Sequence, residues 1–400
     1  DGSAAVSLPE VPLLAVLPGT GGLTRLVDKR KVRRDLADVF CTLEEGVRGR
    51  RAVEWRLVDE TVPNSRFVET VKTRAAELAA GSDRPAGESG IVLTPLDRKL
   101  SDGRVDYSHI GVMLDPQLRV ATITLKGPAD GVPESIEQIK QQGAAFWPLT
   151  LVRELDDALL HLRTNESETC TLVFKTRGEV EAVAAYERIL QSNAADWFVR
   201  EIILYWKRTF KRIDMTSRST LTLVDQGSCF SGLLAELVFA ADRTYMLEGK
   251  LEDDERPEAA LQLSAFNFGL LPMSNGLTRL QTRFLGEPES LGSASRNMGE
   301  SLDAVAALDA GLVTFAPDDI DWQDEIRLLL EERASFSPDA LTGMEANLRF
   351  AGPETMETKI FGRLTAWQNW IFQRPNAVSD GGALRLYGSG VRPEFNKQRV

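Results

Sequence analysis

The chain has 400 residues, enough for two or three domains, and its 43% hydrophobic and 26% charged residues are ordinary for a globular protein with a real core. A formal net charge of −12 argues against a protein that wraps nucleic acid, because neutralising phosphates requires clustered Lys and Arg. Three widely spaced cysteines fit neither a disulfide framework nor a zinc site, and no apolar stretch is long enough to span a bilayer. We therefore expect a cytoplasmic protein without a metal site.

The first candidate for chemistry is Glu10, which stands in the apolar segment Leu8–Leu14. A carboxyl group among apolar neighbours is suited to proton transfer. The alternative interpretation is a surface glutamate that precedes a tight turn. With only His109 and His161 in the chain, any acid–base chemistry depends on carboxylates and backbone donors.

A glycine-rich turn follows Glu10 and contains the candidate substrate-binding residues Gly19, Gly21 and Gly22. Glycines there let the backbone approach a ligand closely and open the next helix, whose free N–H groups favour negative charge. The turn therefore marks a place where an anionic or polarised group of a substrate is expected.

The middle of the chain divides into a helix, a linker and an α/β module. Ser65 caps a helix that runs to Ala80 and stops at Gly81, so residues 1–81 form one domain, and the polar residues 82–106 read as a linker. Residues 107–335 alternate between strand and helix patterns. The expected strands are 110–115, 118–126, 171–175 and 220–224, and the expected helices are 149–162, 179–190, 197–210 and 233–241.

Glu236 is the second candidate, because it follows the small-residue turn 227–232 and points from the first turns of an otherwise apolar helix. A buried glutamate in this place is either an acid or a structural group that an arginine holds, and we favour the structural role. Residues 336–400 are expected to form a helical extension, with helices after Ser337 and over 353–372. Trp367 and Trp370 suggest a packed or intersubunit helix there.

The two regions carry an internal repeat. Gly22–Leu26 recurs letter for letter as Gly276–Leu280, and each copy follows a proline four residues earlier. Two related modules are therefore expected. If the first module is as long as the second, its start lies roughly 150 residues before residue 1. We therefore expect the first module to be truncated here.

These segments resemble the crotonase, or enoyl-CoA hydratase, superfamily. The stretch LPEVPLLAVLPGTGGLTRL (8–26) is similar to the segment in which that superfamily carries one catalytic glutamate before a Pro-Gly-x-Gly-Gly turn, and Glu10 falls on it with one extra residue before the turn. SCFSGLLAELVFAAD (228–242) resembles the segment with the other glutamate, at Glu236. The match breaks at Ala265, which takes the place equivalent to Glu10. The resemblance implies an α/β fold of repeated crotonase-like (ClpP/crotonase) ββα modules, the first truncated and the second complete but non-catalytic.

A narrower resemblance covers nearly the whole chain. TSRSTLTLVDQGSCFSGLLAEL, SPDALTGMEANLRFAGPETMETKIFGRLTAWQNWIFQRPNAV and GSGVRPEFNKQRV look like the benzoyl-CoA-dihydrodiol lyase family, also named 2,3-epoxybenzoyl-CoA dihydrolases, which fuses two crotonase-like modules. The resemblance implies hydrolytic ring opening of a 2,3-epoxide of benzoyl-CoA to a semialdehyde CoA thioester and formate, in aerobic benzoate degradation.

By this resemblance Glu10 is catalytic, the second glutamate and the oxyanion donors lie before residue 1, and the 400 residues alone are expected to be inactive. No cofactor is expected beyond the CoA of the substrate, and a homodimer is expected. Two alternatives stay open: a generic enoyl-CoA hydratase or isomerase, and a non-catalytic crotonase-like scaffold.

Overall fold

The computed structural model describes residues 4–84, 87 and 89–399 and divides the chain into two compact units. The first unit is Asp1–Glu88 and the second is Ser89–Val400. Each unit has its own hydrophobic core, and each is described by itself.

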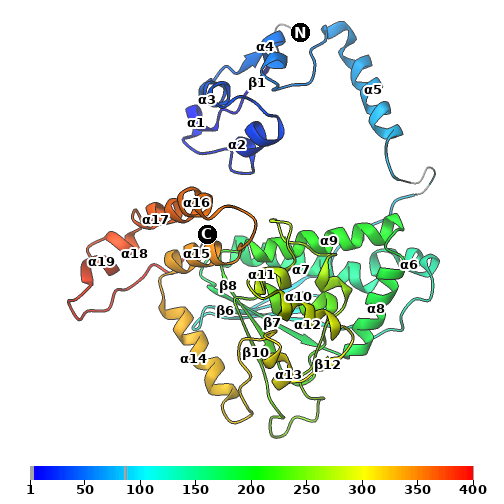
Figure 1. Ribbon diagram of the computed structural model, residues 1–400, viewed down its shortest axis with the longest axis vertical. Coiled ribbons are helices and arrows are strands. Elements are labelled where there is room, and N and C mark those ends of the chain that lie inside the picture. Colours follow the sequence, from blue (N-terminus) through cyan, green and yellow to red (C-terminus); the bar gives the residue numbers. More distant parts are fainter. Residues whose placement is uncertain (1–3, 85–86, 88, 400) are drawn as a thin grey trace. The chain divides into compact units, whose positions relative to one another are not determined.

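The second unit is built on a seven-stranded sheet in the order β10-β8-β7-β6-β5-β4-β3 (Figure 1). The strands from β6 to β10 run parallel and those from β3 to β6 are antiparallel. Every residue of β8 is buried, as expected for a central parallel strand covered on both faces. The strands are β3 (Lys99–Ser101), β4 (Arg104–Asp106), β5 (Ile110–Asp115), β6 (Val120–Lys126), β7 (Thr171–Arg177), β8 (Ser219–Val224) and β10 (Arg243–Met246).

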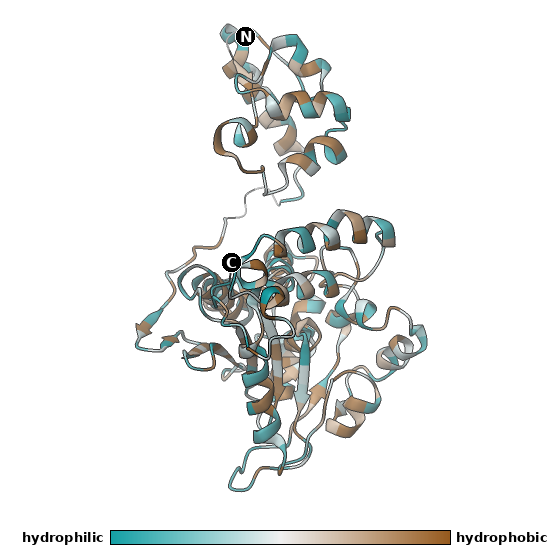
Figure 2. Cartoon of the chain, turned by 90° about the vertical axis from the view of Figure 1, so that its left-hand side faces the viewer, coloured by the Kyte–Doolittle hydropathy of each residue, from teal (hydrophilic) through white to brown (hydrophobic). Residues whose placement is uncertain are grey.

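Helices cover this sheet, and their apolar faces form the core. The predicted amphipathic helix over 149–162 is confirmed as α7, in which Leu151, Leu155 and Leu162 are buried. Hydrophobic and hydrophilic residues alternate along the surrounding helices (Figure 2), which is typical of amphipathic helices that pack on a sheet. The helices up to residue 309 are α6 (Ile136–Gln142), η2 (Gly143–Ala145), α7 (Trp147–Asn165), α8 (Val180–Ser192), α9 (Trp197–Asp214), α10 (Gly232–Ala240), η3 (Ala265–Phe268), α11 (Arg279–Arg283), α12 (Pro288–Arg296) and α13 (Ala304–Asp309).

A second, three-stranded sheet in the order β12-β11-β9 lies beside the start of α10. Its strands are β9 (Phe230–Ser231), β11 (Leu261–Gln262) and β12 (Ser301–Leu302). Because β9 runs directly into α10, this sheet sets the position of the N-terminus of α10.

The predicted linker over 82–106 is wrong in its second half. Residues 99–106 form β3 and β4, which pair with each other and extend the large sheet through β5. Ile91 and Leu96 also pack against the core of the second unit. The polar composition of this segment reflects an edge hairpin with an exposed face rather than a free connection. The second unit therefore begins near residue 89 rather than at residue 107.

The C-terminal region belongs to the second unit and is not a separate body. The helix predicted over 353–372 is shorter and contains a π-helical turn, and the helix after Ser337 is confirmed. The helices are α14 (Trp322–Ser335), α15 (Pro338–Leu348), α16 (Met356–Lys359), the π-helix η4 (Ile360–Leu364), α17 (Thr365–Ile371), α18 (Pro375–Val378) and α19 (Ala383–Leu386).

The first unit is small and mostly helical. Its core contains Leu26, Phe40 and Val47, and β1 pairs with β2 in antiparallel fashion. The predicted helix ends at Ala80 as expected, but the cap at Ser65 is wrong: the helix begins at Asn64 with Pro63 at its N-cap, and Ser65 lies within its first turn. The elements are β1 (Ala5–Val6), α1 (Glu10–Leu14), α2 (Gly22–Thr24), the π-helix η1 (Arg25–Lys29), α3 (Arg34–Thr42), β2 (Val47–Arg48), α4 (Gly49–Glu54) and α5 (Asn64–Ala80).

An ion-pair cluster anchors the end of the chain to the sheet. Arg399 is buried and donates to the carbonyl oxygen of Cys170 at 2.6 Å and to Oε2 of Glu345 in α15 at 2.9 Å. Arg333 and Arg349 approach the same carboxylate at 3.3 Å and 3.7 Å. The tail, which has little periodicity in sequence, is therefore held by tertiary contacts.

We expect Arg399→Met to lower the free energy of unfolding by roughly 2–3 kcal/mol, because it removes one partner of a buried carboxylate while two others remain. Urea denaturation measures this loss. Arg392→Met, at an exposed position of the same tail, is the matched control and should change the midpoint little. Equal midpoints for the two variants would contradict the anchoring role.

Candidate functional site

Glu10 opens α1 in the first unit, and its side chain is half-buried. One carboxylate oxygen, Oε2, is enclosed and has no hydrogen-bond partner among the described residues. A buried polar atom without a partner is costly unless a water or ligand satisfies it. Oε2 of Glu10 is therefore enclosed by the first unit and not exposed to bulk solvent.

Helix α3 lies beside this carboxylate. Burial raises the pKa of the Cys41 thiol, and the negative charges of Asp38 and Glu10 raise it further. The three predicted buried thiols, Cys41, Cys170 and Cys229, are confirmed as free and buried. Cys41 is therefore a neutral, apolar neighbour of Glu10 rather than a nucleophile.

The glycine turn packs against the segment that leads into α1. A Cβ on Gly22 would lie 2.7 Å from Cβ of Pro18 and 3.7 Å from Cδ1 of Leu8, so only glycine fits there. Gly21 has a φ of 104°, which L side chains rarely adopt. Gly19 is exposed. The glycines thus hold the turn against the chain near Glu10.

The structure does not bring Glu10 and these glycines into one cavity within the first unit. A cavity of about 600 Å³ lies between α5 and the β1–β2 pair, and neither Glu10 nor the three glycines line it. The joint site that the sequence predicts for them stays a prediction.

Glu236 lies fully buried in α10 of the second unit and is held on both oxygens. Asn267 Nδ2 donates to Oε1 at 2.8 Å, and Arg279 Nη1 donates to Oε2 at 2.6 Å. Burial raises the pKa of Glu236, and Arg279 opposes that shift. A carboxylate with both oxygens occupied by protein donors has little capacity to move a proton, so the geometry favours the structural role.

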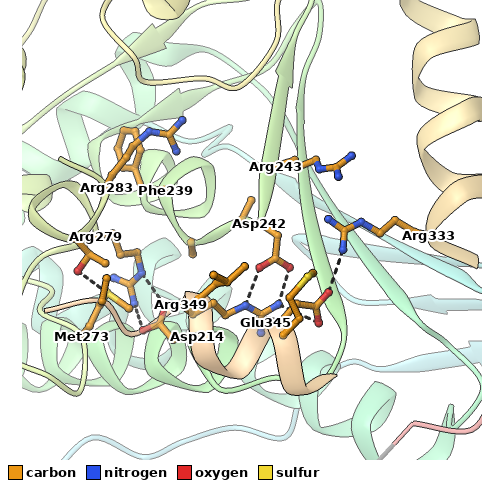
Figure 3. Close-up of a pocket in the computed structure, with 16 residues that line it drawn as sticks. Asp214, Phe239, Asp242, Arg243, Met273, Arg279, Arg283, Arg333, Glu345 and Arg349 are labelled. Carbon is orange, nitrogen blue, oxygen red and sulfur yellow. Dashed lines mark hydrogen bonds and ion pairs between the residues drawn. The ribbon is translucent and has the colours of Figure 1, made fainter. Parts of the chain in front are cut away.

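Arg279 is shared between two carboxylates. Its Nε and Nη2 donate to Asp214 at 3.0 Å and 2.7 Å (Figure 3), while Nη1 donates to Glu236. Burial alone would lower the pKa of Arg279, but the two carboxylates raise it above its ordinary value. Arg279 is the arginine of the repeated Gly276–Leu280 motif, so the repeat was the signal that could have identified it.

Figure 3 shows the cavity of about 450 Å³ that Arg279 borders. The carboxylates that line it are paired with guanidinium groups: Arg349 meets Asp242 at 2.6 Å, and Arg333 meets Glu345 at 3.3 Å. Burial alone would raise the pKa of Asp242, but Arg349 lowers it below the ordinary value. These ion pairs neutralise the buried carboxylates and so stabilise the second unit. Among the described lining residues, no carboxylate is therefore left for acid–base chemistry.

Glu187 is a buried carboxylate that the sequence analysis missed. It comes from α8, and Oε1 accepts a hydrogen bond from the backbone N–H of Leu233 in the first turn of α10. A Cβ on Gly232 would collide with this carboxylate and with Oγ of Ser264. Oε2 has no hydrogen-bond partner among the described residues. A charged residue among the buried Val183, Tyr186 and Leu190 of an amphipathic helix was the signal that could have revealed it.

Glu187 occupies the N-terminus of α10, where backbone N–H groups lack partners within the helix. Free N–H groups at a helix N-terminus stabilise developing negative charge on a substrate. Here the donor of Leu233 is already taken by a side chain of the protein. Ala265, which the resemblance sets in the place equivalent to Glu10, begins η3 and supplies no carboxylate. The N-terminus of α10 is therefore occupied by a carboxyl group of the protein itself.

In the part of the chain that the structure describes, no group of three or more His, Cys, Asp and Glu side chains is placed to hold a metal ion. The described helices are also too short or too polar to cross a bilayer.

We expect Glu187 to make stability fall as pH rises. Burial raises the pKa of Glu187 from 4.5 to about 7, so the folded state holds this proton more tightly than the unfolded state. The stabilisation is present below pH 4.5 and is lost as pH rises toward 7, by about 3 kcal/mol in all. Glu187→Gln stays neutral and should flatten this slope.

Denaturation midpoints between pH 5 and pH 8 measure the effect, and Glu181→Gln, at an exposed position of the same helix, serves as the control. A pH slope in Glu187→Gln equal to that of the unchanged protein would show that Glu187 is not the titrating group.

Comparison with known proteins agrees with the fold. An enoyl-CoA hydratase from Geobacillus kaustophilus superposes over 76% of this chain and 100% of its own, with a TM-score of 0.52 at 15% identity. A Pseudomonas aeruginosa protein, DspI, covers 78% of this chain and 100% of its own, with a TM-score of 0.50 at 16% identity. At this identity the likeness shows the fold alone, and that fold is crotonase-like, as predicted.

No model of a protein family matches the chain. A curated relative does: the chain is 49% identical over all of its 400 residues to the benzoyl-CoA-dihydrodiol lyase of Aromatoleum evansii and covers 71% of that protein. Identity at this level over the whole chain shows a lyase with a crotonase-like fold: the chain belongs to the benzoyl-CoA-dihydrodiol lyase family.

Proposed function

We propose that this protein opens the ring of 2,3-epoxy-2,3-dihydrobenzoyl-CoA by hydrolysis, in aerobic benzoate degradation. The products are formate and an open-chain semialdehyde CoA thioester. The observation that carries the proposal is the 49% identity over the whole chain to a protein named for a lyase of benzoyl-CoA-dihydrodiol. Atom balance requires two water molecules per turnover and no net oxidation or reduction, so hydrolysis alone accounts for the products. CoA enters as part of the substrate.

Glu10 is the residue that we assign to proton transfer. Its half-buried carboxylate has an enclosed oxygen that lacks a partner among the described residues, which suits a group that holds a water molecule. In the proposed reaction Glu10 takes a proton from the attacking water, and a second acid protonates the opened epoxide oxygen. The turn formed by Gly19, Gly21 and Gly22 would border the substrate.

The second module acts as a scaffold in this proposal. Glu187 fills its oxyanion position, and Arg279 and Asn267 hold Glu236. Both features support a module that was retained for folding rather than for turnover. We place the enzyme in the cytoplasm, and we propose a homodimer because crotonase-like proteins are commonly oligomers.

We expect Glu10→Gln to reduce the rate of formate release from the epoxide thioester at least 100-fold, since general acid–base catalysis contributes about 10²–10⁴-fold. The assay uses the protein as the cell makes it. Glu236→Gln makes the same chemical change in the second module and should keep the rate within about threefold. Full activity of Glu10→Gln, with its folding verified by circular dichroism, would refute the assignment.

The same assay separates the remaining candidates. Hydration of a simple enoyl-CoA by the unchanged protein, without formate release from the epoxide, would indicate a generic enoyl-CoA hydratase or isomerase. The absence of both activities would indicate a non-catalytic scaffold. The only support for this alternative is that Glu187 and Glu236 of the second module are engaged by groups of the protein.

A further inference from the structure

The cavity in Figure 3 is lined by more guanidinium groups than carboxylates. It has a volume of about 450 Å³, and its lining includes three carboxylates and five arginines, Arg243, Arg279, Arg283, Arg333 and Arg349. We call it the arginine cavity. Three of the arginines pair with the lining carboxylates, and Arg243 meets Glu332 at 3.5 Å. Among the described residues, no carboxylate lies at ion-pair distance from Arg283.

Arg283 ends α11 and is held in place at one nitrogen. Its Nε donates to the carbonyl oxygen of Gly311 at 2.6 Å, while Nη1 and Nη2 have no acceptor among the described residues. Burial lowers the pKa of Arg283, whereas carboxylates raise the pKa of the buried Arg279 and Arg349. The edge formed by Nη1 and Nη2 is therefore left for a carboxylate, which a guanidinium binds with two parallel hydrogen bonds.

The walls of the arginine cavity carry apolar side chains. Phe239 and Met273 are buried, and Met344 and Leu348 of α15 are 43% and 68% exposed. Met344 and Leu348 are four residues apart and so lie on one face of α15. A ligand that covers them removes apolar surface from water, and methionine sulfur makes favourable contacts with aromatic rings.

The C-terminal end of α10 also borders the cavity, and the carbonyl groups at such an end repel anions. Here threonine hydroxyls donate to these carbonyl oxygens: Thr222 to Leu237 at 2.8 Å, Thr244 to Val238 at 2.8 Å and Thr220 to Ala240 at 3.5 Å. The partial negative charge of the helix end is thereby reduced on the side where an anion would bind.

We propose that the arginine cavity binds an aromatic monocarboxylate of the size of benzoate, with its carboxylate on Arg283 and its ring against Met344 and Leu348. The volume lies within the range of about 300–1,000 Å³ that is usual for small-molecule sites. A bare oxyanion would leave the apolar wall uncovered, and an uncharged ring would leave both Nη groups without acceptors. A ring that carries a carboxylate satisfies both.

The ligand of this site is distinct from a thioester substrate, whose acyl carbonyl group carries no free carboxylate. All residues that line the cavity belong to the second unit, whereas Glu10 belongs to the first. Within α10, the cavity borders Phe239, and the N–H group that Glu187 occupies is on Leu233. At about 1.5 Å of rise per residue, these two positions are about 9 Å apart along the helix. The site therefore goes beyond the proposed reaction and suits an effector.

Isothermal titration calorimetry of the protein as the cell makes it, with sodium benzoate, tests the proposal. We expect saturable binding, and weaker binding of formate, inorganic phosphate and benzamide, each of which supplies only the charge or only the ring. Arg283→Met should weaken benzoate binding about tenfold or more, because it removes both Nη donors. Arg283→Lys keeps the charge but loses the fork, and Leu348→Gln makes the wall polar; each should weaken binding about threefold.

Two exposed residues of α14 supply matched controls. Arg327→Met and Leu328→Gln make the same chemical changes outside the cavity and should leave benzoate binding unchanged. Leu348→Gln changes an exposed side chain, so it provides a result even where Arg283→Met does not fold.

Undetectable benzoate binding, equal affinity for benzamide or phosphate, or losses in the control variants equal to those in Arg283→Met would each overturn the site. Glu10→Gln, which tests the proposed function through formate release, should leave benzoate binding unchanged. Failure of the reaction and failure of the cavity are thus seen separately. A loss of benzoate binding in Glu10→Gln but not in Arg283→Met would place the ligand at Glu10 and overturn the arginine cavity.

Discussion

The stability of the second unit depends on how the carboxylates that are buried beside α10 are neutralised. Arg279 joins Asp214 at the end of α9, Glu236 in α10 and the carbonyl oxygen of Leu271, so one guanidinium fixes three segments that are far apart in sequence. An isolated buried charge is unstable by several kcal/mol, whereas a charge with ideal partners is tolerated. Because two carboxylates share one arginine, this cluster keeps a negative excess that a third buried carboxylate, Glu187, increases.

The pKa of Glu187 rises from 4.5 to about 7 chiefly because the carboxyl group is buried, and the negative charge of the cluster makes only a minor contribution. Burial is the largest cause of its raised pKa, and the negative charge of Glu236 adds to it, while the N–H of Leu233 and the hydroxyl of Ser264 oppose it. The first turn of α10 is thus an anion site that the protein fills with its own side chain. A substrate oxygen would have to displace Glu187 to reach the same N–H group.

The repeated motif shows how far identical letters determine local structure. Gly276–Leu280 leads into α11, where Thr278 caps the helix and Arg279 is buried between carboxylates. Gly22–Leu26 forms α2 and enters a π-helix, and Arg25 is exposed. The residues around each copy determine where its helix begins and which side chains are buried. The repeat therefore indicated that the two segments are related in sequence, but it did not predict their conformations.

Periodicity predicted most of the second unit because its strands are continuous apolar runs and its helices carry one apolar face, as β8 and α7 illustrate. It failed at β3 and β4, whose side chains are largely exposed and whose pairing depends on β5, a partner that local composition does not reveal. The site was predicted unevenly for the same reason. Glu10 stood out by its apolar neighbours, whereas the roles of Glu187, Asp214 and Arg279 arise only when the four helices α8, α9, α10 and α11 meet.

A catalytic module and a scaffold module, as we propose for this chain, face opposite requirements at the same position. A module that catalyses must leave helix N–H groups and a carboxylate oxygen without protein partners, and each such group lowers stability. A module that only supports folding can satisfy them internally, as Leu233 and Glu236 are satisfied here. Glu236 is held on both oxygens, whereas Oε2 of Glu10 has no hydrogen-bond partner among the described residues. That contrast between the two glutamates is the physical argument for the proposal that places the chemistry at Glu10: an unpaired carboxylate oxygen lowers stability until a substrate or a water molecule restores the contact.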